Sequence, residues 1–542
     1  MGDLPHHPPE TDVDRLRADD LDELADQWFW RDDPDASMRW RREAYRRHVR
    51  DGDDDRSSRA AWRLFYDHFL VGETAPAGGW LERCREHADR AGDVAAGWLA
   101  IADADWADRG DDPLGRRRRS SDAVEIARAV GDRDLLAMAL QSHGRALIAA
   151  GEGRDGRRLL DEAMVAVVND ELDPLYTGWV FCNVVSTCFE LADLRRAQQW
   201  SDAAVRWCDG GDVGRMYPGL CRVYAVELDA LRGSWESARA GVTRACADLH
   251  AYDPRYAASA HEVAGDLALR RGDLDGADDE YRRCRELGGA PHRGLALLRA
   301  ARGDVAVALA ELRALAEARS APFPDAMLLL AMSDLAAEIG DASAVRLAAE
   351  RLATLAADHP SELVDALALA VRGELALMEG DLVAALHDLV ESTSRLTEHD
   401  VRHEAARRRV RAADVSARLG DHAHAVVELD AAIAVFDDLG AEPDGVRARS
   451  HRALLLDGGD PSPSPESSAG PLSRRELDVL ELVASGHTNR QVADRLVIST
   501  HTVDRHMSNI RSKLGVSSRA AAIALAYEHG WLDGAAPASS NG

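Results

Sequence analysis

Lysine is almost absent from this 542-residue sequence: Lys513 is the only one, and arginine supplies every other basic side chain. A P-loop needs a lysine that reaches the β- and γ-phosphates of a nucleotide, so the sequence excludes a nucleotide site of that kind. Two other catalytic patterns are missing too. No G-x-S-x-G sequence occurs, and His403-Glu404 lacks the second histidine of a zinc-protease helix because Arg407 stands in its place. We therefore expect no enzyme activity, no cofactor and no metal site.

Cysteine pairs and long apolar runs are also missing. The seven cysteines are scattered and none forms a C-x-x-C pair, which favours free thiols in a reducing compartment. Residues 1–15 are polar and contain proline, without the apolar core of a signal peptide, and no apolar run approaches the length of a membrane span. The sequence predicts a cytoplasmic protein with no membrane partner.

Positive charge is scarce outside the C-terminal end. The formal net charge is −28; from Pro471 onward eight Arg and Lys stand against seven Asp and Glu, which leaves +1 there and −29 for the rest. Nucleic-acid affinity comes largely from neutralising phosphates, so residues 1–470 are a poor partner for DNA or RNA. Any contact with nucleic acid is expected at the C-terminal end.

The sequence is rich in helix-forming residues that a turn interrupts at regular intervals. From about Leu21 to Leu456 it is dominated by Ala, Leu, Arg and Glu, and a Gly-Asp-like turn recurs every 31 to 41 residues. A repeat of this length predicts a solenoid of helical hairpins, in which stacked neighbours bury the faces that one hairpin cannot bury alone. The turns are expected at Arg31, Gly72, Gly110, Gly151, Ala192, Gly233, Gly272, Gly303, Gly340, Gly380 and Gly420.

The clearest repeat runs from Ala264 to Cys284. Gly265 precedes the turn at Gly272, and Ala277 and Tyr281 follow it. Glycine and alanine let the paired helices approach closely, and we expect Tyr281 to fill the space between neighbouring hairpins. These positions resemble tetratricopeptide (TPR) repeats with a longer unit than usual.

Tryptophan is concentrated in the first half, where eleven of the twelve lie at or before Trp235. The favoured interpretation is that these residues pack one repeat against the next. An aromatic ligand groove in the first five or six repeats stays open as the alternative, because indole offers apolar area and one hydrogen-bond donor.

The segment from Pro471 to Leu532 has the pattern of four short helices. Ser473 and Glu476 have the spacing of a capping box, and so do Thr488 and Gln491, while Gly486 is suited to end the first helix. A short helix, a tight turn and a helix with a polar outer face are typical of a helix-turn-helix that places one helix in the major groove. The apolar positions at helical spacing are Leu477, Leu480, Leu482 and Val483, then Val492, Ala493 and Leu496, and then Val503, Met507, Ile510 and Leu514.

The residues of this segment carry a specific resemblance. The run Gly486-x-Thr488-Asn489-Arg490-Gln491-Val492-Ala493, with Thr502-Val503 and Lys513-Leu514-Gly515-Val516 after it, resembles the LuxR-type (GerE-like) helix-turn-helix family. The resemblance implies a transcription regulator that binds double-stranded DNA, here without the P-loop ATPase module of large relatives. One position departs from it: the family commonly has lysine after the Thr-Val pair, whereas Asp504 would repel a phosphate.

The resemblance also assigns roles to individual residues. Those expected near phosphates are Asn489, Thr502, His506 and Lys513. Those expected near base edges are Asp504, Arg505, Ser508 and Asn509. A homodimer contact is expected on the fourth helix, through Ala520, Ile523, Ala524 and Tyr527.

The sequence thus predicts an all-α protein with a TPR-like helical-hairpin solenoid of about eleven hairpins over residues 16–456. A flexible linker (457–470) and a small four-helix LuxR-type helix-turn-helix domain (471–534) follow, with disordered ends at 1–15 and 535–542. The expected partners are double-stranded DNA, a second copy of the chain, and a protein, peptide or small molecule on the solenoid, with RNA polymerase as a further candidate. A TPR adaptor whose C-terminal domain binds protein is the alternative.

Overall fold

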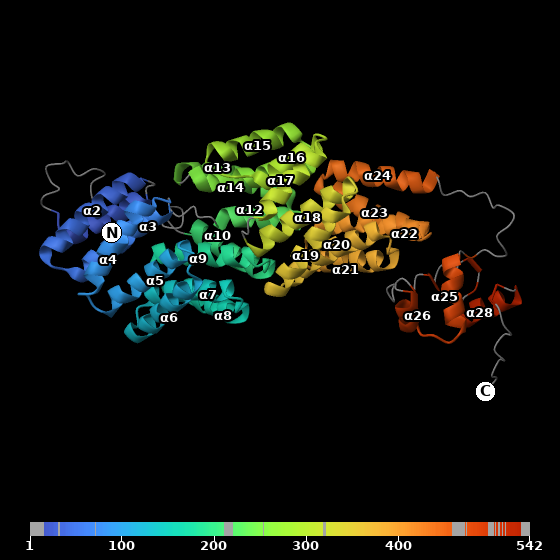
Figure 1. Ribbon diagram of the computed structural model, residues 1–542, viewed down its shortest axis with the longest axis horizontal. Coiled ribbons are helices and arrows are strands. Elements are labelled where there is room, and N and C mark those ends of the chain that lie inside the picture. Colours follow the sequence, from blue (N-terminus) through green and yellow to red (C-terminus); the bar gives the residue numbers. More distant parts are fainter. Residues whose placement is uncertain are drawn as a thin grey trace. The chain divides into compact units, whose positions relative to one another are not determined.

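The computed structural model describes residues 16–30, 33–70, 72–210, 221–252, 254–317, 321–457, 472, 474–496, 503, 506–507, 510–511, 513–514, 516, 518–529 and 531–532 (Figure 1). All regular structure in these stretches is α-helical, which confirms the predicted fold class. The predicted terminal segments 1–15 and 535–542, and all but the first residue of the predicted linker, lie outside them.

Internal contacts divide the chain into two units, and the domain boundaries given above stay predictions. The first unit comprises Met1–Ala331 and Arg351–Asp365, and the second comprises Met332–Glu350 and Ala366–Gly542. The helices of the first unit are α1 (Ala18–Trp30), α2 (Pro34–Asp51), α3 (Asp54–Leu70), α4 (Thr74–Ala88), α5 (Asp93–Arg109), α6 (Pro113–Val130), α7 (Arg133–Ala149), α8 (Gly153–Val168), α9 (Pro174–Glu190), α10 (Leu194–Gly210), α12 (Cys221–Arg232), α13 (Trp235–Tyr252), α14 (Pro254–Arg271), α15 (Leu274–Glu286), α16 (His292–Ala301) and α17 (Val305–Glu317).

Three helices contribute residues to both units: α18 (Pro322–Glu338), α19 (Ala342–Asp358) and α20 (Glu362–Glu379). The second unit continues with α21 (Leu382–Glu398), α22 (Arg402–Arg418), α23 (His422–Leu439), α24 (Glu442–Asp457), α25 (Arg474–Ala484), α26 (Asn489–Leu496) and α28 (Arg519–Glu528). Among the described residues, no helix is both long enough and apolar enough to cross a membrane.

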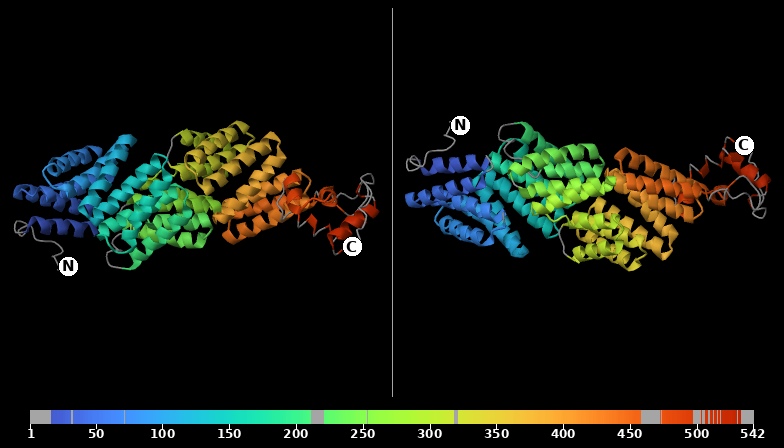
Figure 2. Two further views of the ribbon diagram at one scale, coloured as in Figure 1. Left: turned by 90° about the horizontal axis from the view of Figure 1, so that it is seen from below. Right: turned by 90° about the horizontal axis from the view of Figure 1, so that it is seen from above.

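Consecutive helices pack as antiparallel pairs. In the first unit α3 packs on α4, α5 on α6, α7 on α8 and α14 on α15, and in the second unit α22 packs on α23. Figure 2 shows these pairs side by side in two further views. The pairing confirms the predicted solenoid of helical hairpins.

The recurring Gly-Asp pair ends one helix and begins the next. Gly272 has a φ of +87°, and the amide of Asp273 donates to the carbonyl of Ala268 at 3.0 Å. The Asp273 carboxylate then accepts from the amide of Gly276 at 2.9 Å and caps α15. Glycine adopts this left-handed conformation without strain and aspartate is a preferred N-cap, so the turn explains why both residue types recur.

Ten of the eleven predicted turns lie in the described residues, and each falls between two consecutive helices; Arg31 lies outside them. The turn at Gly110 differs in detail from the prediction. Its left-handed residue is Asp111, with a φ of +54°, whereas Gly110 has a φ of −84°. The connection between α5 and α6 has three residues, like that between α7 and α8, and Asp112 still provides the N-cap through the amide of Gly115.

Tyr281 packs where three helices meet, as the repeat pattern predicts. It is fully buried, and a Cβ placed on either Gly265 of α14 or Gly294 of α16 would overlap its ring. Its hydroxyl donates to Asp266 at 2.7 Å. Glycines on both flanking helices therefore make room for one large side chain, which joins neighbouring hairpins.

Candidate nucleic-acid interface and partner groove

The described part of the C-terminal segment encloses a small apolar core of its own. The predicted third-helix stripe is buried at Val503, Met507 and Ile510, whereas Leu514 is partly buried. In the first helix the fully buried residues are Val479, Leu480 and Val483; the predicted Leu477 and Leu482 only pack against them. The remaining buried members are Leu472, Val492, Ala493, Ala522, Ala526 and Leu532.

The turn before the second helix has the predicted cap. Gly486 has a φ of +86°, which ends α25. The amide of Gln491 donates to the Thr488 hydroxyl at 3.3 Å, and the Gln491 side chain accepts from the amide of Thr488 at 2.9 Å. This reciprocal pair is a capping box and fixes where α26 begins.

Arg519 links the fourth helix to the beginning of the second, a contact that no local pattern in the sequence predicts. Its guanidinium donates to the side-chain oxygen of Asn489 and to the carbonyl of His487, both at 2.7 Å. Asn489 is one of the residues expected near phosphate. The contact orients its side-chain amide at the N-terminal end of α26, where backbone N–H groups favour an anion.

Lys513, the only lysine, has a protein partner in this structure. Its ammonium donates to the Glu476 carboxylate at 2.8 Å; Glu476 is buried, whereas the Lys513 side chain is 46% exposed. The pair joins α25 to the third helical segment, which contains Val503 to Leu514. It also neutralises part of the positive charge that we expected to face a DNA phosphate. Ser473, the other half of the predicted first capping box, lies outside the described residues.

The predicted DNA-contacting residues are described only in part. Asn489, His506 and Lys513 have described positions; Asn489 and His506 are partly buried, and Lys513 is exposed. His506 and Lys513 are seven residues apart, nearly two helical turns, so they share a face of the helix. The predicted residues Thr502, Asp504, Arg505, Ser508 and Asn509 lie outside the described residues.

The fourth helix has two different faces. Ala522 and Ala526 are fully buried in the domain core. Of the four residues expected to form a dimer contact, Ala520 and Ala524 are exposed. Ile523 and Tyr527 are partly buried against that core. A small-residue face with two larger neighbours is therefore present at the surface of α28.

The sequence of this segment matches a known family. Residues 470–526 match the family described as bacterial regulatory proteins, luxR family. The C-terminal domain belongs to the luxR family. The segment is 41% identical over 61 residues to the transcriptional regulatory protein DegU of Brevibacillus brevis, which covers 11% of this chain and 26% of that protein. It is 45% identical over 66 residues to the transcriptional regulatory protein DesR of Bacillus subtilis (strain 168), which covers 12% and 33%. The chain thus spans a third or less of the length of these two relatives.

Solved structures resemble the helical part only loosely. A Cut9 chain of the APC/C Cut9–Hcn1 hetero-tetramer aligns over 82% of this chain and 90% of its own length, with 13% identity and a TM-score of 0.36. A Rap protein complexed with competence and sporulation factor aligns over 78% and 99%, with 11% identity and a TM-score of 0.25. Both scores are too low to equate the folds.

Outside the luxR-family domain, three tryptophans of the first unit are buried, Trp62, Trp98 and Trp235, and the others whose burial is described are partly buried. Trp62 and Trp98 are each at most 2% exposed, and their ring centroids are 4.7 Å apart. The rings of Trp179 of α9 and Tyr66 of α3 are in contact, with their centroids 4.8 Å apart. The Arg59 guanidinium lies 4.0 Å from the centroid of the Trp98 ring. Trp62, Trp98 and Trp179 thus contact aromatic side chains of other helical hairpins, which agrees with the packing interpretation at these positions.

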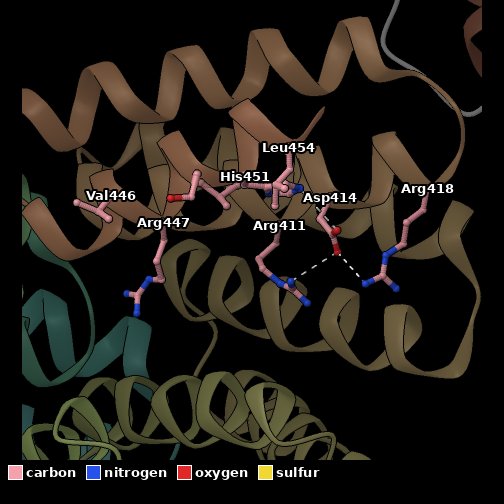
Figure 3. Close-up of a pocket in the computed structure, with 9 residues that line it drawn as sticks. Arg411, Asp414, Arg418, Val446, Arg447, His451 and Leu454 are labelled. Carbon is pink, nitrogen blue, oxygen red and sulfur yellow. Dashed lines mark ion pairs between the residues drawn. The ribbon is translucent and has the colours of Figure 1, made fainter. Parts of the chain in front are cut away.

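A groove of about 450 Å³ lies between α22 and α24, the last helix before the luxR-family domain (Figure 3). Asp414 lies among three basic side chains: its carboxylate is 3.1 Å from Arg418, 3.6 Å from Arg411 and 4.0 Å from His451. Leu454, 72% exposed, lines the same groove. Apolar and cationic groups side by side suit a ligand that is apolar and carries a carboxylate.

Proposed function

We propose that this chain is a sequence-specific, DNA-binding transcription regulator of the LuxR type, whose helical solenoid receives a signal or recruits a partner. The observation that carries the proposal is the family match over residues 470–526. It is supported by the capping box at Thr488 and Gln491 and by the buried stripe of the third helical segment. Its relatives DegU and DesR are named as transcriptional regulatory proteins.

In this proposal the third helical segment enters the major groove. Asn489, Thr502, His506 and Lys513 contact phosphates, and Asp504, Arg505, Ser508 and Asn509 approach base edges. Two copies meet through Ala520, Ile523, Ala524 and Tyr527 on α28. Ala520 and Ala524 are exposed, so they leave apolar surface on this helix that a second copy can cover. RNA polymerase is a further candidate partner.

The groove of Figure 3 is the candidate partner site on the solenoid. Its lining contains three arginines and one carboxylate, Asp414. Each arginine pairs with an acid, Arg411 with Glu374, Arg418 with Asp414 and Arg447 with Asp444, so a ligand carboxylate would join or replace these pairs. The exposed Leu454 adds apolar area beside them. The proposed ligand is an apolar protein segment or small molecule with at least one carboxylate.

The test of DNA binding uses the full chain and genomic footprinting to find its preferred site. Arg505→Ala should weaken binding at that site by about 1–3 kcal/mol and relax one base position, because arginine can donate two hydrogen bonds to guanine. Asp504→Lys should strengthen binding to all sequences. If one phosphate contact forms, the slope of log K against log salt concentration should steepen by about 0.9. Arg346→Ala is the matched control, since Arg346 is an exposed arginine of α19.

Fluorescence anisotropy with the preferred and a scrambled duplex separates the outcomes. Equal affinity of the wild-type protein for both duplexes would rule out sequence-specific binding. If the protein binds no duplex at low salt, the TPR adaptor that binds protein through its C-terminal domain becomes the better description. For the groove, Leu454→Asp with Arg418→Glu should abolish the response of a reporter at a footprinted promoter while the DNA affinity stays unchanged.

A further inference from the structure

A second groove, of about 370 Å³, lies in the first unit between α10, α12 and α13. α12 packs on each of the other two helices (Figure 1). At one end of the groove Arg222, near the N-terminus of α12, lies 3.1 Å from Asp209, near the C-terminus of α10. At the other end the hydroxyl of Ser237, in the first turn of α13, donates to Asp229 of α12 at 2.7 Å. α12 therefore runs antiparallel to both neighbours, and the position of a residue in its helix gives its position along the groove.

Charged side chains of opposite sign line the two ends. The basic end has three arginines and one aspartate: Arg206, Arg222, Arg244 and Asp209. The acidic end has Asp202 and Asp229, and the described residues that line it include no basic side chain. A helix rises about 1.5 Å per residue, so the seven residues from Arg222 to Asp229 separate the two ends by about 10 Å.

The two outer helices bring their charges to the same ends as α12. Asp202 precedes Asp209 by seven residues on α10, which places it level with the acidic end of α12. A Cβ on Gly241 of α13 would lie 2.7 Å from the side chain of Val226, which marks the middle of the groove. Arg244 lies three residues beyond Gly241, toward the basic end.

The basic end has guanidinium groups without an ionic partner. Asp209 pairs with Arg222, whereas Arg206 and Arg244 are exposed and form no ion pair with any described residue. A guanidinium presents its N–H groups as a planar fork that matches the two oxygens of a carboxylate. This end is therefore suited to a carboxylate of a ligand.

The acidic end has carboxylates that only neutral groups contact. Asp202 accepts from the side-chain amide of Gln198 at 2.6 Å, and Asp229 accepts from the Ser237 hydroxyl at 2.7 Å. The side-chain oxygen of Gln198 is buried and has no hydrogen-bond partner in the described part of the chain. Two uncompensated carboxylates and a free amide oxygen are suited to an ammonium group, which only donates.

We infer that this groove binds a free peptide of about three residues, with its N-terminal ammonium at the acidic end and its C-terminal carboxylate at the basic end. An extended chain advances about 3.3–3.6 Å per residue, so about three residues span the distance between the two ends. Val205, Ala225 and Val226 line the groove and are suited to a short apolar side chain in the middle of the peptide. A ligand with two like charges would be repelled at one end. Binding here deepens the proposed signal-receiving role of the solenoid, and its consequence for transcription rests on that role.

The test is isothermal titration calorimetry of the full-length protein with the tripeptide alanyl-valyl-alanine. The same peptide is also used with its N-terminus acetylated and with its C-terminus amidated. The free peptide should bind, and each modification should weaken binding about tenfold or more, because it removes the charge that one end of the groove contacts. DNA takes no part in this measurement, so a failure of peptide binding and a failure of DNA binding are seen separately.

Paired variants assign each end of the peptide to one end of the groove. In Arg206→Ala with Arg244→Ala, the free peptide should bind as weakly as the amidated peptide binds to the wild-type protein, and amidation should cause no further loss. Asp202→Asn with Asp229→Asn should behave in the same way toward acetylation. Arg239→Ala is the matched control and should leave the affinity unchanged, because Arg239 is an exposed arginine of α13 that does not line the groove.

Three results would overturn the inference. The first is no binding of the free tripeptide at millimolar concentration. The second is a loss on amidation that is as large in the double arginine variant as in the wild-type protein, with circular dichroism showing that the variant keeps its helices. The third is binding of ω-aminooctanoate, a zwitterion of similar length without peptide bonds, as tightly as the tripeptide. If a variant does not fold, the comparison of the three peptides on the wild-type protein decides alone.

Discussion

Two clusters of carboxylates, one in each unit, have opposite protonation behaviour. In the first unit Glu227, Glu262 and Asp266 share one guanidinium, that of Arg293, which lies 2.6 Å from Asp266. Burial, and then the negative charges of Glu262 and Asp266, raise the pKa of Glu227 from 4.5 to about 8. Burial and Asp266 raise the pKa of Glu262 to about 7. One oxygen of Glu227 is buried without a hydrogen-bond partner.

In the second unit three carboxylates, Asp334, Glu404 and Asp444, meet three guanidiniums: those of Arg407 and Arg408, and that of Arg447, which lies 2.6 Å from Asp444. Arg408, almost fully buried, donates to both oxygens of Asp334 at 2.7 and 2.8 Å, and Arg407 lies 2.9 Å from the same carboxylate. Burial again opposes ionisation, but here the arginine charges outweigh it and hold the pKa of Asp334 and of Glu404 below the ordinary range. The pKa of Asp444 is lowered by hydrogen bonding to His403 and by Arg407, also against its burial.

The comparison shows that burial alone does not set the charge of an interior carboxylate. Both clusters are desolvated, and desolvation favours the neutral acid in each. What differs is the number of guanidiniums within reach: one for three carboxylates in the first cluster, three for three in the second. The first unit therefore retains protonated glutamate near neutral pH, whereas the second unit retains ionised carboxylates well into the acid range.

The largest expected effect comes from removing a cation in the second unit. Arg408→Ala should destabilise this unit by about 3–5 kcal/mol, because Asp334 and Glu404 stay buried without the charge that compensates them. Arg418→Ala is the matched control, since Arg418 is 54% exposed and its partner Asp414 keeps Arg411 and His451 beside it. The loss of stability should be within about 1 kcal/mol. Hydrogen exchange of the backbone amides of α22 measures the loss of stability in both variants. Equal losses would mean that the buried ion pair adds nothing to the stability of the second unit.

Acid should unfold the second unit before the first. A carboxylate with a lowered pKa binds fewer protons in the folded state than in the unfolded state, so its stabilisation is present above pH ~4 and is lost as the pH falls below that value. We expect the second unit to lose about 2–3 kcal/mol on this account. Eleven of the twelve tryptophans lie at or before Trp235, so helical circular dichroism should fall while tryptophan fluorescence stays constant. Simultaneous loss of both signals would contradict this order.

Alkaline pH should act on the first unit instead. The raised pKa means that folded Glu227 holds a proton which the unfolded chain has released, so stability falls as the pH rises from 4.5 through about 8. Glu227→Gln should remove this penalty and stabilise the first unit on the order of 2 kcal/mol above pH 8, with little gain near pH 5. Urea unfolding followed by tryptophan fluorescence measures the difference. Glu236→Gln, at an exposed site on α13, is the control and should give no gain. A gain for Glu227→Gln that is the same at both pH values would point to packing rather than charge.

Local sequence patterns predicted the elements of the fold well, because a helix end depends on residues close together in the chain. The glycine and aspartate of each turn identify where one helix stops and the next starts, and Thr488 with Gln491 does the same for α26. At one turn the left-handed residue is Asp111, one position after the predicted Gly110, and the spacing alone did not reveal this shift. The apolar stripe of the third helical segment followed from its period.

Side-chain partners could not be predicted in the same way. Arg408 and Asp334 are 74 residues apart, Lys513 and Glu476 are 37 apart, and Arg519 and Asn489 are 30 apart. Nothing in the local pattern distinguishes these arginines and acids from the many others.

The sequence by itself determined that the chain is a helical-hairpin solenoid followed by a luxR-family domain, since periodicity, turn residues and a local motif are properties of neighbouring residues. The tertiary structure decided which carboxylates keep their charge and where Lys513 finds its partner. The physical reason is that electrostatic and hydrogen-bonding partners are set by the distances between helices in space, and these depend on how the hairpins stack.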